Sequence, residues 1–156
     1  MRILFVCMGN ICRSPTAEGV LRTLAVQRGL DGQIEIDSAG TGGWHAGDPP
    51  DPRATAAAAA RGVTLHGAAR QVRQADFDAF DLILALDSAN LRDLRRIAPD
   101  RDRAAKLRLL REFDPASAGL GDLDVADPYY GRTRGFDDVF DQIHAACAGL
   151  LDQLAP

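Results

Sequence analysis

The feature that most constrains this chain is a short apolar run that leads directly into a loop containing a cysteine and an arginine. Residues 3–6 are all apolar and are followed by a turn that contains Gly9, a pattern typical of a strand buried on both faces. Pro15 then begins a run with helical periodicity, and proline suits the first turn of a helix because its missing N–H is not needed there. The sequence therefore predicts a loop, residues 7–14, between the end of a strand and the start of a helix.

This loop has the composition of an anion-binding site built around a nucleophile. Its backbone N–H groups and the N-terminus of the following helix favour negative charge, and the planar guanidinium of Arg13 presents paired donors that match phosphate oxygens. The same positive field favours the thiolate form of Cys7, which is the nucleophilic form. We therefore expect a thiolate to attack phosphorus in a phosphate held by Met8, Gly9, Asn10, Ile11, Cys12, Arg13 and Ser14.

Two motifs that lie far apart in the chain resemble those of the low-molecular-weight protein tyrosine phosphatases. One is residues 7–15, and the other is the Asp-Pro-Tyr-Tyr segment at residues 127–130. The resemblance extends from residue 2 to about residue 154. It implies a hydrolase that cleaves phosphotyrosine and aryl phosphates through a phosphocysteine intermediate, without cofactor or metal. The catalytic residues that it implies are Cys7, Arg13 and Asp127.

Cleavage of an aryl phosphate needs a carboxylic acid, because the leaving phenolate must gain a proton. Asp127 precedes a proline, which biases it toward extended backbone, and once ionised it can activate the water that attacks phosphocysteine. The likeness of residues 127–130 to the family's acid loop ranks Asp127 above Asp122 and Asp124, and Asp124 is the alternative acid.

The resemblance also implies side chains that support the loop. In the family the serine that matches Ser14 donates to the nucleophilic sulfur, although as a bare observation Ser14 could equally be a helix cap. Asn10 tolerates left-handed backbone, and in the family its side chain is tied to a serine and a histidine. Ser38 and His66 are the matching candidates in this chain.

Aromatic residues near both motifs suggest a substrate pocket. Trp44 lies in a glycine-rich loop with few apolar neighbours. We expect Trp44, Tyr129 and Tyr130 to wall a slot that favours phosphotyrosine, whose phosphate lies far from its backbone. Asp87, at the end of the expected third strand, is interpreted as a helix cap in preference to a partner of Arg13.

The cysteines have different expected roles. Cys12 is either a small filler of the loop or, five positions from Cys7, a partner for a reversible disulfide formed on oxidation. Cys147 lies on the apolar face of the last expected helix, which is typical of a core position. The three histidines, His45, His66 and His144, lack the spacing of metal ligands.

The order of apolar segments predicts a three-layer α/β/α fold with a four-stranded parallel sheet. Strands are expected near residues 3–6, 33–37, 82–86 and 107–110, with helices between them that begin at Pro15, Asp51-Pro52 and Asp87-Ser88 and a last one over residues 136–154. The fully apolar first and third strands should be central and the mixed second and fourth strands at the edges. This gives the order 2-1-3-4, with the phosphate-binding loop at the topological switch point.

The composition limits the number of domains, the partners and the cellular location expected of this chain. A chain of 156 residues suits one domain, residues 1–156. A net charge of −4 argues against a nucleic-acid partner, and no apolar stretch is long enough for membrane insertion. Three cysteines without a disulfide pattern favour the cytoplasm. The expected partners are phosphotyrosine-containing proteins such as a bacterial tyrosine kinase, and the expected state is a monomer or weak dimer.

Three other functions compete. An arsenate reductase on the same scaffold would use further cysteines, but none lies between Cys12 and Cys147. A protein-arginine phosphatase would carry threonine where this chain has Ile11. A silent phosphate-binding module would not need both Cys7 and Asp127. The sequence therefore favours a tyrosine phosphatase.

Overall fold

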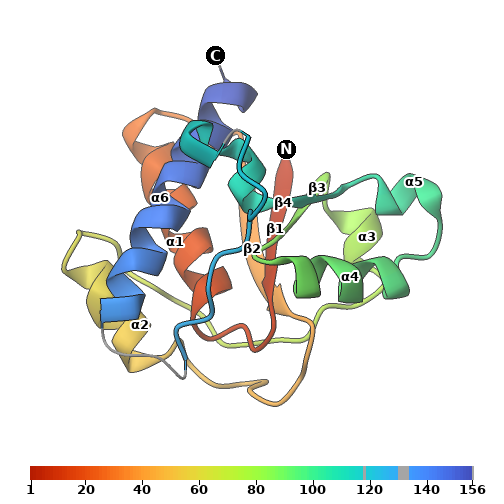
Figure 1. Ribbon diagram of the computed structural model, residues 1–156, viewed down its shortest axis with the longest axis horizontal. Helices are drawn as coiled ribbons and strands as arrows, with labels where there is room; N and C mark the ends of the chain where they lie inside the picture. The colour runs from red at the N-terminus through yellow and green to blue at the C-terminus, as the bar shows by residue number, and fades with distance from the viewer. Residues whose placement is uncertain (118, 130–133, 156) are drawn as a thin grey trace.

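The computed structural model describes residues 1–117, 119–129 and 134–155, and its centre is a parallel four-stranded sheet (Figure 1). The strands are β1 (Arg2–Cys7), β2 (Glu35–Gly40), β3 (Leu82–Ala85) and β4 (Leu107–Leu109). Their order is β2-β1-β3-β4, and every pairing is parallel. The predicted order is therefore confirmed, with the two fully apolar strands at the centre.

Helices cover both faces of the sheet (Figure 1). On one face lie α1 (Arg13–Gln27), α2 (Pro52–Ala59) and α6 (Arg134–Leu154), and on the other lie α3 (Asp76–Ala79), α4 (Ser88–Ile97) and α5 (Arg101–Ala104). Two 3-10 helices, η1 (Leu110–Phe113) and η2 (Pro115–Ser117), follow β4. Within the described residues, no helix combines the length and the apolar character needed to cross a bilayer.

The residues of β1 divide between two hydrophobic cores because successive side chains of a strand point to opposite faces. Ile3 and Phe5 pack in the core beneath α1, α2 and α6, whereas Leu4 and Val6 pack in the core beneath α3 and α4. All four are fully buried. This double burial explains why the strand reads as one continuous apolar run.

Local sequence signals indicate where α1, α2 and α4 begin. The carboxylate of Asp51 caps α2 by accepting from the N–H of Arg53 at 2.8 Å, and that of Asp87 caps α4 by accepting from the N–H of Asn90 at 2.7 Å. Helix α1 begins at Arg13, two residues before the expected Pro15. Proline is tolerated there because the first N–H groups of a helix have no intrahelical acceptor.

The edge strand β2 is longer toward its carboxyl end than its alternating pattern predicts. Its pairing with β1 continues to Gly40, which lies opposite Cys7. A Cβ on Gly40 would come within 2.6 Å of the carbonyl oxygen of Met8, so a residue without a side chain lets β2 approach the loop after β1 closely. The carboxyl ends of β1, β2 and β3 thus converge on the predicted loop.

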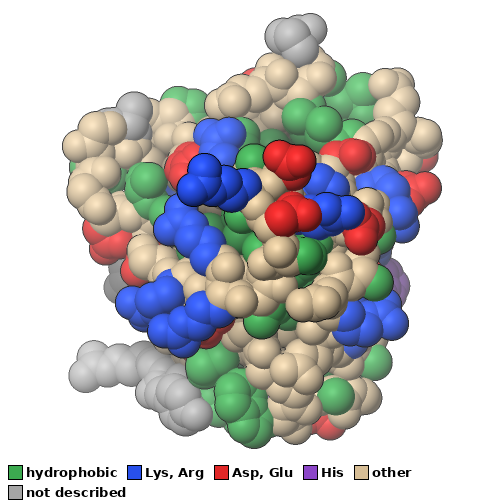
Figure 2. Space-filling model, turned by 90° about the vertical axis from the view of Figure 1, so that its right-hand side faces the viewer, with side chains coloured by type: hydrophobic (Ala, Val, Ile, Leu, Met, Phe, Trp, Pro, Cys, Tyr) green, Lys and Arg blue, Asp and Glu red, His purple; other side chains and the backbone are tan. Residues whose placement is uncertain are grey.

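The face that carries α3, α4 and α5 shows basic and acidic side chains intermixed (Figure 2). Arg103, for example, pairs with Asp78 at 2.8 Å and also with Asp100. On this face acidic side chains therefore lie beside basic ones.

Candidate active site

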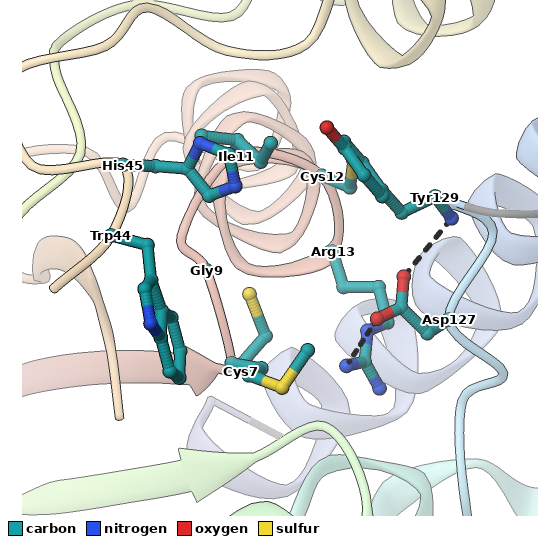
Figure 3. Close-up of a pocket in the computed structure, with 10 residues that line it drawn as sticks. Cys7, Gly9, Ile11, Cys12, Arg13, Trp44, His45, Asp127 and Tyr129 are labelled. Carbon is teal, nitrogen blue, oxygen red and sulfur yellow. Dashed lines mark hydrogen bonds and ion pairs between the residues drawn. The ribbon is translucent and has the colours of Figure 1, made fainter. Parts of the chain in front are cut away.

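The loop after β1 forms the floor of a pocket of about 420 Å³ (Figure 3). Cys7 lies at its base, only 3% exposed, and the backbone N–H of Asn10 donates to the Cys7 sulfur at 3.3 Å. Asn10 has a φ of 57°, the left-handed conformation that asparagine tolerates better than most residues. The pocket is lined by Cys7, Met8, Gly9, Ile11, Cys12, Arg13, Trp44, His45, Asp127 and Tyr129.

The side chain of Asn10 holds the loop against β2. Its Nδ2 group donates to the hydroxyls of Ser14, at 2.8 Å, and Ser38, at 3.0 Å. Its Oδ1 atom accepts from the backbone N–H of Arg70 at 3.0 Å. Ser38 in turn donates to a carboxylate oxygen of Glu18 at 2.7 Å. Every polar group of this buried amide is therefore bonded within the protein, which fixes the loop in one shape.

His66 does not take the place expected for it. Its side chain is exposed at the edge of a small cavity of about 70 Å³ behind the loop, and no hydrogen bond joins it to Asn10 in the described part of the chain. The Oδ1 atom of Asn10 accepts instead from the backbone N–H of Arg70, and the Ser38 hydroxyl donates to Glu18. Among the residues that the structure describes, Ser38 bonds Asn10 as expected, whereas His66 makes no hydrogen bond to it.

Ser14 is placed to donate to the sulfur. Its Oγ atom lies 3.0 Å from the Cys7 sulfur and accepts a hydrogen bond from Nδ2 of Asn10. Its own proton therefore points to either the sulfur or the carbonyl of Ala39, and the carbonyl is farther away, at 3.4 Å. The N–H of Asn10 and the Ser14 hydroxyl are therefore the two groups that can donate to the sulfur.

The guanidinium of Arg13 is buried beside the cysteine and held by the protein. Its Nη1 atom donates to Asp87 at 2.6 Å and to the carbonyl of Val125 at 2.9 Å, and its Nη2 atom lies 3.5 Å from Asp127. Burial by itself lowers the pKa of Arg13, but the charges of Cys7, Asp87 and Asp127 outweigh it and raise the pKa. The group is therefore a permanent cation in the pocket.

Asp127 faces this cation from the far wall (Figure 3). One carboxylate oxygen lies near Arg13 and the other accepts from the backbone N–H of Tyr129 at 3.0 Å. Asp124, the alternative acid, instead accepts from both the backbone N–H and the hydroxyl of Ser88, each at 2.7 Å. It does not line the pocket. The geometry therefore favours Asp127 as the acid.

The walls of the pocket are aromatic. Trp44 is 75% exposed, and its ring lies against Gly42, where a Cβ would come within 1.7 Å of the indole. Tyr129 stands on the opposite side, with His45 between them at a ring distance of 5.9 Å from Tyr129 (Figure 3). Tyr130, the third expected wall residue, lies outside the described residues.

His45 also lines the pocket, although the sequence did not predict it as a pocket residue. Its Nδ1 atom lies 3.2 Å from Asp48, and its ring is 3.0 Å from the position that a Cβ on Gly9 would take. The one available signal was its place directly after Trp44 in the same loop. Gly9 thus lets the loop that carries His45 close over the phosphate-binding loop.

The other two cysteines differ in their relation to the pocket. Cys12 lines it, and burial, followed by the charges of Asp51, Cys7 and Asp127, raises the pKa of its thiol to about 12. Cys147 is fully buried on α6, where burial also raises its pKa. Both are free thiols, as is Cys7. Over the described residues, no three His, Cys, Asp or Glu side chains form a metal-binding group.

A cysteine and an arginine on a tight loop after the first strand of a parallel sheet are the arrangement expected of a cysteine-dependent phosphatase. The chain belongs to the low molecular weight phosphotyrosine protein phosphatase family, whose profile matches residues 2–156. It is 55% identical over 150 residues to the low molecular weight protein-tyrosine-phosphatase of Streptomyces coelicolor. The aligned residues are 96% of this chain and 91% of the relative. It is 40% identical to the human low molecular weight phosphotyrosine protein phosphatase, over 97% of this chain and 94% of the relative.

Solved structures agree with this assignment. YfkJ from Bacillus subtilis superposes with a TM-score of 0.90 at 40% identity, covering 99% of this chain and 94% of that one. A Drosophila arginine phosphatase superposes with a TM-score of 0.91 at 32% identity, covering 100% of this chain and 99% of that one. These comparisons confirm the family and the fold that the two motifs predicted.

Proposed function

We propose that this protein is a protein tyrosine phosphatase that hydrolyses phosphotyrosine and aryl phosphates through a phosphocysteine intermediate. The observation that carries the proposal is the placement of Cys7. The backbone N–H of Asn10 donates to its sulfur and the Ser14 hydroxyl lies 3.0 Å from it, and the Arg13 cation and the Asp127 carboxyl line the same pocket. This arrangement suits the binding of a phosphate dianion directly in front of a nucleophilic sulfur.

In the first step, the backbone N–H groups of the loop and the Arg13 guanidinium bind the phosphoryl oxygens. The thiolate of Cys7 attacks phosphorus, so that an S–P bond forms while the P–O bond to the phenol breaks. The Asp127 carboxyl group gives its proton to the departing oxygen. Positioning of the reactants and electrostatic stabilisation of the equatorial oxygens supply most of the rate in phosphoryl transfer, and a fixed guanidinium contributes to both.

In the second step, the ionised Asp127 takes a proton from water as the water oxygen attacks phosphorus. The P–S bond breaks, inorganic phosphate forms, and Cys7 leaves as a thiolate. The Ser14 hydroxyl, 3.0 Å from the sulfur, stabilises the charge that returns to it. The same carboxyl group therefore serves as acid and then as base.

The pocket supports an aromatic phosphomonoester as the substrate. The side chains of Trp44, His45 and Tyr129 line the pocket that has Cys7 at its base. A phosphate at the end of a flat, extended group fits such a pocket and reaches the sulfur. Ile11 at the pocket edge gives a hydrophobic contact there. Cys147 is buried in the core between α1 and α6, which counts against the chain of exposed thiols that an arsenate reductase needs.

The proposed partners are phosphotyrosine-containing proteins, among them a bacterial tyrosine kinase. We propose a cytoplasmic setting, because Cys7 and Cys12 must stay reduced for activity, and a monomer or weak dimer as the working state. Profiling the phosphopeptides retained by an Asp127→Ala variant, against the wild-type protein as control, tests the partner. Recovery of no phosphotyrosine peptide above the control contradicts it.

The decisive experiment compares wild-type protein with Cys7→Ser on p-nitrophenyl phosphate, a phosphotyrosine peptide, a phosphoarginine peptide and arsenate. We expect turnover of the first two by wild type, none by Cys7→Ser, and vanadate binding by both. An acid-quenched reaction should carry phosphate on Cys7, located by peptide mass spectrometry. Full activity of Cys7→Ser, or a preference for phosphoarginine or arsenate, contradicts the proposal.

A further inference from the structure

Arg53, near the start of α2, connects the phosphate-binding loop, residues 7–14, to the acid segment, residues 125–129. Its Nε and Nη2 atoms bind both carboxylate oxygens of Asp51, at 3.2 and 3.1 Å. The same Nη2 atom also donates to the backbone carbonyl of Tyr129, at 3.0 Å. Because Nη2 carries two protons, one hydrogen bond fixes the side chain to α2 and the other reaches the acid segment.

The carboxylate that anchors Arg53 is itself tied to the phosphate-binding loop. Asp51 is buried, and its side chain caps α2 by accepting from the N–H of Arg53 at 2.8 Å. Its own backbone N–H donates to the carbonyl of Ile11 at 2.8 Å. The position of Arg53 is therefore set by the loop that holds the phosphate.

Arg53 also packs between two rings. Its guanidinium carbon lies 5.4 Å from the centre of the Tyr129 ring and 4.7 Å from the centre of the Phe136 ring on α6. Stacking on aromatic rings adds to the hydrogen bonds and limits the rotamers of the side chain.

The acid segment, residues 125–129, has an attachment at each end. At its start the N–H of Val125 donates to the carbonyl of Leu86, just after β3, at 2.8 Å. At its end the carbonyl of Tyr129 accepts from Arg53. Asp127 lies midway between these attachments, so its carboxyl group is placed by both.

We propose that Arg53 is a positioning residue that holds the acid segment so that the Asp127 carboxyl group meets the leaving oxygen of the substrate. The proposal rests on the proposed role of Asp127 as the general acid. Arg53 itself touches neither the phosphate nor the leaving group. Its effect is therefore on proton transfer to the phenolate, which depends steeply on the distance between donor and acceptor.

Arg61 provides a matched control. It lies just after α2, its guanidinium stacks on Phe140 of α6 at 4.9 Å, and it pairs with Asp137 at 2.9 Å and Asp141 at 3.4 Å. It therefore joins α2 to α6 in the same chemical manner. Among the described residues it has no contact with the acid segment.

The test is the dependence of kcat/KM on the leaving group across a series of aryl phosphates. Loss of proton donation lowers kcat/KM for phenyl phosphate, because its leaving group is basic. It hardly changes kcat/KM for 2,4-dinitrophenyl phosphate, because that leaving group is stable as an anion. We expect Arg53→Met to lower kcat/KM by roughly 10- to 100-fold for phenyl phosphate and by less than about 3-fold for the dinitrophenyl ester. Arg53→Lys, which keeps the charge but loses the planar fork, should steepen the dependence in the same direction.

Asp127→Asn sets the upper limit of this effect. In that background Arg53→Met should add no further steepening, because no proton remains to be positioned, and Arg61→Met should leave the wild-type dependence unchanged. An equal loss on all esters, or a steepening by Arg61→Met as large as by Arg53→Met, overturns the role of Arg53. If Asp127→Asn itself fails to steepen the dependence, the acid assignment in the proposed function is wrong instead.

Discussion

The carboxylate of Asp87 binds Arg13 through one oxygen and caps a helix through the other. Oδ2 accepts from Nη1 of Arg13 at 2.6 Å, while Oδ1 accepts from the N–H of Asn90 at 2.7 Å. The sequence suggested the two roles as alternatives and favoured the cap. The structure combines them, so the Arg13 guanidinium, which lines the pocket, is held by the residue that caps α4.

Replacing Asp87 by serine should separate these two roles. Serine keeps a helix-capping oxygen but is too short to reach Arg13, so the guanidinium loses its strongest partner. We expect kcat/KM for p-nitrophenyl phosphate to fall roughly 10- to 100-fold, as for other displaced catalytic groups. Asp93→Ser is the control, because Asp93 pairs with Arg96 at 3.5 Å on the same helix. Unchanged kinetics in Asp87→Ser would show that Arg13 is aligned without this carboxylate.

The choice of acid is tested by two aspartates three positions apart. Asp127→Ala should lower kcat/KM for a phosphotyrosine peptide by roughly 10²- to 10⁴-fold, the usual contribution of general acid catalysis. Asp124→Ala removes the acceptor for Ser88 but no pocket group, so we expect less than about a 3-fold change on the same principle. A larger loss in Asp124→Ala than in Asp127→Ala reverses the assignment.

Cys12 is expected to protect Cys7 from irreversible oxidation. Its pKa of about 12 keeps it a neutral thiol throughout the neutral range, since a thiol ionises only as the pH approaches its pKa. Peroxide should therefore oxidise Cys7 to the sulfenic acid, and the Cys12 thiol should then displace water and form a disulfide. We expect dithiothreitol to restore most activity of the wild type after peroxide treatment.

Cys12→Ser is the matching variant for this prediction. Relative to its own turnover before peroxide, it should recover little activity from dithiothreitol, because sulfenic acid without a resolving thiol oxidises further. Cys147→Ser serves as the control, since that thiol is buried in the core. Equal recovery of Cys12→Ser and wild type, or absence of a linked Cys7–Cys12 peptide by mass spectrometry, contradicts the role.

The parts of the fold that sequence predicted are those fixed by local signals. Residues 3–6 indicate a doubly buried strand because every side chain is apolar, and Asp51 and Asp87 indicate helix starts because their side chains satisfy nearby N–H groups. The end of β2 was not predictable in the same way. Its extension to Gly40 depends on pairing with β1, a contact between segments far apart in the chain.

In the candidate site, too, the residues that lie together in the sequence were predicted, whereas some of those from distant segments were not. Residues 7–14 act as one contiguous loop, so their spacing determines their geometry. His45 lines the pocket and Arg53 binds the carbonyl of Tyr129. Both belong to other segments of the sequence, and only the folded chain brings them there. The backbone N–H of Arg70 gives Asn10 the hydrogen bond that was expected from His66, and no local pattern in the sequence predicts that exchange of partners.

A glycine in the last helix tests the packing behind the site. Gly149 lies within α6, and a Cβ there would come within 1.9 Å of the carbonyl oxygen of Phe113. Alanine normally stabilises a helix by up to about 1 kcal/mol relative to glycine, but here it must push two backbones apart. We expect Gly149→Ala to lower the free energy of unfolding by about 1–3 kcal/mol, the usual cost of overpacking. Gly135→Ala, in the same helix with 3.7 Å of room to Pro128, should be neutral or stabilising. Urea unfolding followed by far-ultraviolet circular dichroism measures both, and a Gly149→Ala variant as stable as Gly135→Ala contradicts the close approach of α6 to η1.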